Sequence, residues 1–126
     1  MAIQAKKPQR HILVVDDDRL VLAALAEGLR GAGYRVTGVA SGEEALGSVA
    51  RDAPDLALLD VRMPGMSGIE VARRLVASHP HLVVVLISIE ERIDVPSAAL
   101  LDAVPLVRKQ DFGPRLLRRL WSERRR

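Results

Sequence analysis

Four aspartates in the sequence stand where short apolar runs end. Asp16, Asp17 and Asp18 follow one such run, and Asp60 closes another. Carboxylates gathered in one pocket repel one another, so a cluster of them needs a cation. Oxygen ligands on loops favour a hard cation such as Mg²⁺, which accepts one or two carboxylates and keeps several waters. We therefore predict a cation site, against the alternative that one aspartate caps a following helix and the others face solvent.

Two further polar residues follow later apolar runs in the same way. Ser88 comes after the run at 82–87, and Lys109 comes just after the run at 104–107. A hydroxyl and an ammonium beside an acidic cation site favour a phosphoryl group, because the ammonium neutralises its oxygens and the hydroxyl donates a hydrogen bond. Taken alone, Ser88 could be a turn residue and Lys109 a solvated surface charge. Their positions at the ends of successive predicted strands favour a phosphoryl-binding site instead.

The elements that must position these residues alternate between strand-like runs and helical patterns. Strands are predicted at 12–15, 34–39, 56–59, 82–87 and 104–107, and helices at 19–32, 41–51, 67–78 and 112–121. The capping boxes Ser41–Glu44 and Ser67–Glu70 mark two of the helix starts. The segment 90–103 is weakly marked, and we expect it to be the least regular part of the fold.

Strands that are apolar on both faces belong to a parallel sheet with helices on both sides. The alternation therefore predicts an α/β fold, a doubly wound five-stranded parallel sheet of flavodoxin-like strand order 2-1-3-4-5. In such sheets sites lie beyond the carboxyl ends of the strands, where the strand order reverses between strands one and three. Asp16, Asp17 and Asp18 at the end of the first strand and Asp60 at the end of the third stand at that point.

Composition narrows the function classes. The chain has 126 residues, enough for one domain, and contains no cysteine, which excludes disulfides and thiolate metal sites. The net charge of +3 is split, with +3 on 1–10, +5 on 115–126 and −5 between them. This distribution argues against direct DNA binding by the domain. No apolar run is long enough for a membrane span or a signal peptide, and we expect a cytoplasmic protein without a membrane partner.

Four segments resemble the receiver domain of bacterial two-component response regulators. They read HILVVDDD at 11–18, LALLDVRMPGMSG at 56–68, VVVLIS at 83–88 and PLVRKQDF at 105–112. The resemblance covers 11–121 as a stand-alone receiver, which leaves 1–10 as a flexible basic lead and 122–126 as a basic tail.

The resemblance implies a role for each matched residue. Asp60 would be the phosphoacceptor, whose carboxylate attacks a phosphohistidine on a sensor histidine kinase or phosphotransfer protein. Ser88 and Lys109 would hold the phosphoryl group. The implied ligands of Mg²⁺ (or Mn²⁺) are Asp16, Asp17, Asp60 and the backbone carbonyl of Arg62.

Two positions depart from the family pattern. Receivers usually have proline after the lysine, often with a cis peptide bond, and here Gln110 follows. Because a cis bond before a non-proline residue costs about 3 kcal/mol, we predict that the Lys109–Gln110 bond is trans. The switch position three residues before the lysine is usually Tyr or Phe and here is Leu106, so an aromatic ring cannot carry the switch.

Arg62 and Glu90 stand two residues after Asp60 and Ser88. The resemblance implies that such positions tune the rate of phosphoryl hydrolysis. Their opposite charges could pair across the site and restrict water, or they could be two independent surface charges. Both interpretations stay open.

The sequence therefore predicts a phosphorylation-dependent switch that changes a protein-interaction surface for a downstream target. The alternative is an atypical receiver that acts as a phosphorylation-independent interaction module. We expect no output domain in this chain and a monomer or weak homodimer. A conventional enzyme is disfavoured because the chain offers neither a substrate-binding cap nor a GxxxxGKS/T loop, so catalysis is limited to its own phosphorylation and slow autodephosphorylation.

Overall fold

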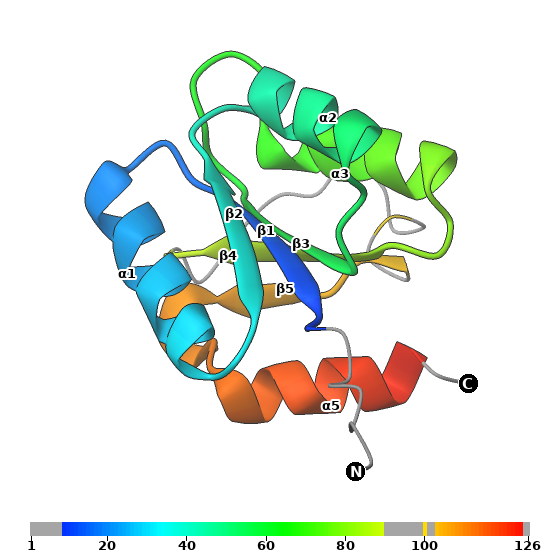
Figure 1. Cartoon of the computed structure of the whole chain (residues 1–126). Helices are drawn as coiled ribbons and strands as arrows, with labels where there is room; N and C mark the ends of the chain where they lie inside the picture. The colour runs from blue at the N-terminus through cyan, green and yellow to red at the C-terminus, as the bar shows by residue number, and fades with distance from the viewer. Residues whose placement is uncertain (1–8, 90–99, 101–102, 125–126) are drawn as a thin grey trace, which may run out of the picture.

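The computed structural model describes residues 9–89, 100 and 103–124. They form a five-stranded parallel sheet of order β2-β1-β3-β4-β5, as predicted (Figure 1). The strands are β1 (His11–Val15), β2 (Arg35–Val39), β3 (Leu56–Asp60), β4 (Val83–Ser88) and β5 (Leu106–Arg108). The helices are α1 (Arg19–Gly31), α2 (Gly42–Arg51), α3 (Gly68–Ser78), α5 (Pro114–Arg124) and the 3-10 helix η1 (Lys109–Asp111).

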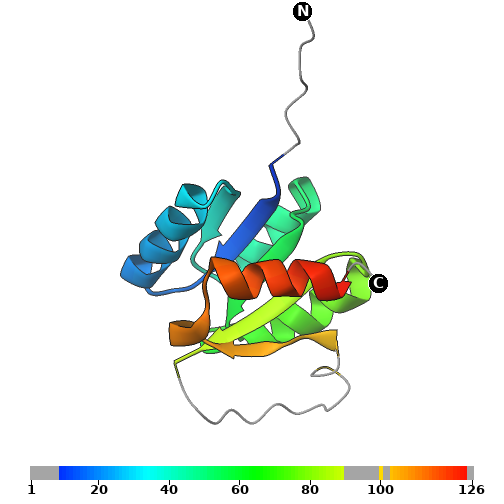
Figure 2. The same cartoon turned by 90° about the horizontal axis from the view of Figure 1, so that it is seen from below.

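Helices cover both faces of this sheet, which is why β1, β3 and β4 are apolar at nearly every position. Alternate strand residues such as Leu13, Leu59 and Leu86 face α2 and α3. The residues between them, such as Val14 and Leu58, face α1 and α5. Figure 1 shows α2 and α3 together on one side, and Figure 2 shows α5 lying across the opposite face. No helix in the described part of the chain is both long enough and apolar enough to cross a membrane.

Side-chain caps begin the helices where the sequence predicts them. The Ser41 Oγ accepts from the Glu44 N–H at 3.2 Å, and the Glu44 carboxylate accepts from the Ala40 N–H at 3.0 Å. The Ser67 Oγ likewise accepts from the Glu70 N–H at 3.2 Å. The Glu70 carboxylate, however, pairs with arginines on its own helix, so the second capping box is made in one direction only.

The C-terminal quarter differs from the prediction. The strand expected at 104–107 is β5 at Leu106–Arg108, because the Val104 N–H still donates to Leu100 in a helical turn at 2.8 Å. The helix expected from residue 112 begins at Pro114, which suits a first helical position because its missing N–H needs no partner there. The weakly marked segment 90–103 lies mostly outside the described residues, so its expected irregularity stays a prediction.

The connection from β3 to α3 folds tightly back onto the strand. The Gly68 N–H donates to the Val61 carbonyl at 3.0 Å. A Cβ atom at Gly68 would lie 2.0 Å from the Asp60 carbonyl oxygen, well inside van der Waals contact. The backbone of this turn therefore accepts only glycine without moving, and it holds the end of β3 where Asp60 stands.

We predict that Gly68→Ala lowers the free energy of unfolding by about 2–4 kcal/mol, because the added methyl group must push the end of β3 away. Urea unfolding followed by circular dichroism measures the change. Gly28→Ala is the matched control, since a Cβ there meets nothing within 4 Å. Alanine at this position in α1 should raise stability by about 0.5–1 kcal/mol. Equal effects of the two variants would contradict the proposed close approach.

Candidate functional site

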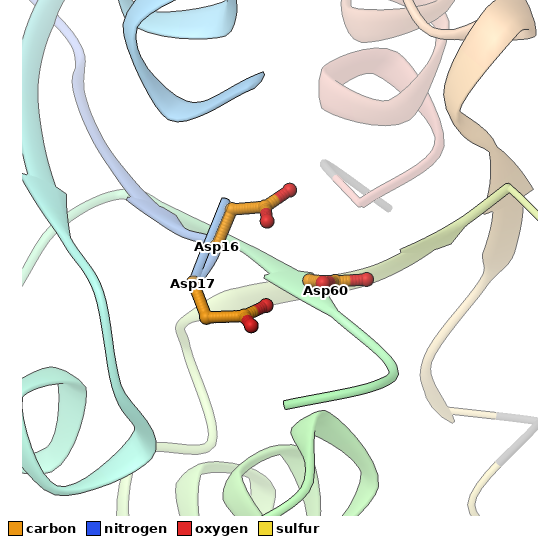
Figure 3. Close-up of side chains that lie close together, drawn as sticks. All are labelled: Asp16, Asp17 and Asp60. Carbon is orange, nitrogen blue, oxygen red and sulfur yellow. The ribbon is translucent and has the colours of Figure 1, made fainter. Parts of the chain in front are cut away.

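Three aspartates meet at the carboxyl ends of β1 and β3. Asp16, Asp17 and Asp60 each offer a carboxylate oxygen, and these oxygens all lie within 4.8 Å of one another. Figure 3 shows the three carboxyl groups pointing to the same side of the strand ends. Asp16 and Asp60 are buried, whereas Asp17 is exposed. The predicted cluster is therefore formed, because β1 and β3 are neighbours in the sheet.

The fourth aspartate has a different task. Asp18 caps α1, since its carboxylate accepts from the N–H groups of Leu20 and Val21 at 3.0 and 3.3 Å. Its own N–H donates to Asp16 Oδ1 at 3.0 Å and so fixes that carboxyl group. The capping alternative is thus correct for Asp18 alone, and the other three aspartates remain available to a cation.

Lys109 reaches into this cluster from the start of η1. Its Nζ lies 2.8 Å from Asp16 Oδ2 and 3.6 Å from Asp60 Oδ1. Burial alone would lower the pKa of Lys109, but the hydrogen bond to Asp16 and the charge of Asp60 raise it above its ordinary value. Lys109 is therefore charged, and one ammonium faces three carboxylates. When all are ionised, two negative charges remain, which is the charge that one divalent cation offsets.

Burial and the neighbouring charge of Asp16 raise the pKa of Asp60 to about 6. Lys109 and the backbone N–H of Arg62 act in the other direction, because both favour the carboxylate. Ionisation of Asp60 therefore costs the folded protein free energy in the absence of a cation. This cost has the sign expected for a cation-binding carboxylate.

The remaining predicted residues lie on neighbouring strands. Ser88 is the buried last residue of β4, and β4 pairs with β3 through Ile87 and Asp60. Leu106 is 37% exposed at the start of β5.

No cis peptide bond occurs in the described part of the chain, so the Lys109–Gln110 bond is trans, as predicted.

Of the two charged residues that could pair across the site, Arg62 and Glu90, the structure describes only Arg62. Arg62 is exposed in the loop after β3. Glu90 lies outside the described residues, so both interpretations, a pair across the site and two independent surface charges, stay open. Gly68 lies in the DVRMPGMSG block, but residue types alone do not reveal that this position requires glycine, because the requirement comes from a close backbone approach.

A sequence profile of the response regulator receiver domain matches residues 12–120. The chain belongs to the response regulator receiver domain family. Among curated relatives, response regulator GacA of Pseudomonas viridiflava is 41% identical over 92 residues, with 71% of this chain and 43% of GacA covered. Response regulator MprA of Mycobacterium leprae is 41% identical over 99 residues, with 75% and 43% covered. This receiver domain spans less than half the length of these relatives.

Solved structures agree with the assignment. Response regulator TrrA of Thermotoga maritima, in complex with Mg²⁺–BeF, has a TM-score of 0.77 at 28% identity and covers 92% of this chain and 99% of its own. A putative response regulator of Chloroflexus aurantiacus has a TM-score of 0.79 at 30% identity, with 94% and 100% covered. TrrA in complex with the histidine kinase ThkA scores 0.74 at 29% identity, with 92% and 98% covered. The predicted receiver fold is confirmed.

We predict that Asp60→Asn stabilises the metal-free receiver at pH 7 by about 1–2 kcal/mol. The wild-type pKa of about 6 lies above the ordinary value of 3.8, so wild-type stability falls as pH rises from about 4 to 7. Asparagine removes that loss, and the two proteins should converge towards pH 4. Urea unfolding in EDTA across this pH range measures the difference.

The exposed Glu27 on α1 supplies the control for charge removal. Glu27→Gln should change stability by less than about 0.5 kcal/mol over the same range. A destabilised Asp60→Asn at pH 7 would show that the Asp60 charge is fully compensated in the metal-free protein.

Proposed function

We propose that Asp60 of this receiver accepts a phosphoryl group in a Mg²⁺-dependent reaction and thereby changes a surface that another protein reads. The donor would be a phosphohistidine on a sensor histidine kinase or phosphotransfer protein. The observation that carries the proposal is the buried Asp60 carboxylate, which lies beside two further carboxylates and the Lys109 ammonium. This arrangement supports a nucleophilic carboxylate with one counter-charge, the Lys109 ammonium, already in place.

The proposed reaction moves one phosphoryl group between two nucleophiles. A carboxylate oxygen of Asp60 attacks phosphorus, the bond from phosphorus to the imidazole nitrogen breaks, and its electron pair stays on the nitrogen. An acyl phosphate forms on Asp60. Autodephosphorylation would be attack of water on the same phosphorus, which returns the carboxylate and inorganic phosphate.

The ligands of the cation in this proposal are Asp16, Asp17, Asp60 and the backbone carbonyl of Arg62. The donor set fits Mg²⁺ because it consists of oxygen atoms with a residual charge of two. A bound divalent cation would offset the negative charge that the carboxylates and the phosphoryl oxygens share in the transition state.

Two residues of this chain would hold the phosphoryl group in place. Lys109 already lies 3.6 Å from Asp60 Oδ1 and would pair with a phosphoryl oxygen. Ser88 ends the strand next to Asp60 and would donate a hydrogen bond from its hydroxyl. TrrA, which was solved with Mg²⁺–BeF and with the histidine kinase ThkA, supports both the cation and the class of partner for a receiver of this fold.

A second candidate function is that of an atypical receiver whose interactions do not depend on phosphorylation. Leu106 at the switch position and Gln110 after the lysine favour it, because both replace residues that the family usually carries. The complete set of site residues favours the first candidate: Asp17, Asp60, Ser88 and Lys109. Covalent phosphorylation distinguishes the two.

Incubation with Mg²⁺ and acetyl phosphate should add one phosphoryl group to the wild-type protein, measured as the mass of the intact chain. Asp60→Asn should gain nothing, because the nucleophile is absent. Asp111→Asn is the matched control and should react like the wild type, since Asp111 lies in η1 outside the carboxylate cluster. A wild-type protein that gains no phosphoryl group from acetyl phosphate or from any histidine kinase would establish the atypical alternative.

Lys109→Gln should slow phosphorylation by acetyl phosphate at least about tenfold, because the side chain that contacts both Asp16 and Asp60 loses its charge. The initial rate of the same mass change measures the effect. Arg115→Gln removes an exposed arginine on α5 and should leave the rate unchanged. An unaltered rate in Lys109→Gln would show that the ammonium does not stabilise the transition state.

A further inference from the structure

A hollow of about 730 Å³ lies at the edge of the sheet opposite the aspartates. It is bounded by the residues that precede β1, β3 and β4 and by Trp121 near the end of α5. Cavities of about 300–1,000 Å³ are the usual size of small-molecule sites. The phosphorylation proposed above does not use this hollow, because Asp16, Asp17 and Asp60 lie at the other ends of the same strands.

An arginine is held in place at this hollow. The guanidinium of Arg10 lies over the indole ring of Trp121, 4.2 Å from the ring centroid. Trp121 is itself buried, and its Nε1–H donates to the Tyr34 hydroxyl at 3.3 Å. Stacking uses the face of the guanidinium and leaves its N–H donors at the edge. Within the described ranges Arg10 has no carboxylate partner, so a positioned cation borders the hollow.

Two histidines lie in the same lining. His79 follows α3. The Ser78 hydroxyl donates to the Arg74 carbonyl and therefore accepts from the His79 Nδ1–H at 2.7 Å, which orients the ring. His81 is exposed and forms no hydrogen bond or ion pair with the part of the chain that the structure describes. The one carboxylate in the lining belongs to Asp55, and its Oδ2 already accepts from the His11 N–H at 2.7 Å. The N–H groups of Arg10 are therefore the main donors around the hollow.

The rest of the lining is apolar. Pro54, Pro80 and Leu82 border the hollow between the histidines and the start of β3. A ligand that satisfies both parts carries a negative oxyanion and a short apolar body. The indole ring of Trp121 is covered by the Arg10 guanidinium, so its role in the hollow is to hold that guanidinium in place.

We propose that this hollow binds a small organic oxyanion, a carboxylate or a phosphate monoester. Its oxygens accept from the N–H groups of Arg10 and from the ring of His81, and its apolar body packs against Pro54 and Pro80. The site is a second binding function of the receiver at the opposite edge of the sheet.

Trp121 is the only tryptophan in the sequence, so its indole N–H gives one NMR signal that reports on the hollow. Titration of the metal-free protein with benzoate and with phenyl phosphate should shift this signal saturably, with a dissociation constant on the order of 1 mM for the preferred probe. The probe that binds more tightly shows whether the hollow prefers a carboxylate or a phosphate monoester. Benzyl alcohol should cause no such shift. Equal binding of the neutral probe, or no saturable shift with either anion, overturns the proposal.

The affinities of three variants distinguish binding in the hollow from general attraction of the anion to a positively charged surface. Arg10→Gln should weaken binding of the preferred probe at least tenfold, and the exposed His81→Gln should weaken it several-fold without altering the fold. Arg115→Gln removes the same charge from α5 outside the hollow and should bind like the wild type. Urea unfolding confirms that each variant is folded. The proposal is overturned if His81→Gln binds the probe like the wild type while Arg10→Gln and Arg115→Gln lose the same amount of affinity.

Discussion

The excess of negative charge at the ends of β1 and β3 is the constraint that the rest of this structure accommodates. Three carboxylates within 4.8 Å share one ammonium, and two of them are buried. Such a cluster destabilises a fold unless hydrogen bonds and counter-charges reach it. Here the N–H groups of Asp18 and Arg62 bind the carboxylates of Asp16 and Asp60, and Lys109 bridges the two. These contacts hold the cluster together but leave two of its three negative charges without a counter-charge when all three carboxylates are ionised.

The sheet keeps this cluster in place. β1, β3 and β4 are buried on both faces, so their ends cannot separate without exposing the two cores against α2 and α3 and against α1 and α5. Gly68 adds a local restraint because the start of α3 presses against the carbonyl of Asp60. The position of the Asp60 carboxyl group is therefore set by packing on both faces of the sheet, and apolar burial elsewhere offsets the electrostatic cost of the cluster.

Much of this arrangement could be predicted from the sequence because it depends on patterns that residue types reveal. Strand-end aspartates, alternation of strands and helices, and the topological switch point together bring Asp16 and Asp60 to one place. The register of β5 could not be predicted, since its start depends on a helical turn that ends at Val104. The hollow opposite the aspartates was also missed, because Arg10 and Trp121 are far apart in sequence and meet only when α5 packs on the sheet.

The two departures from the family pattern affect different steps of a switch. Lys109 lies 2.8 Å from Asp16 although a trans bond to Gln110 follows it, so the turn of η1 positions the ammonium without a proline. The phosphoryl transfer proposed for this domain would thus keep its lysine. Leu106 instead pairs with Leu86, two residues before Ser88 on the same strand. In the proposed switch, a shift of Ser88 toward a phosphoryl group would reach Leu106 through the backbone pairing of β4 and β5 and not through an aromatic ring.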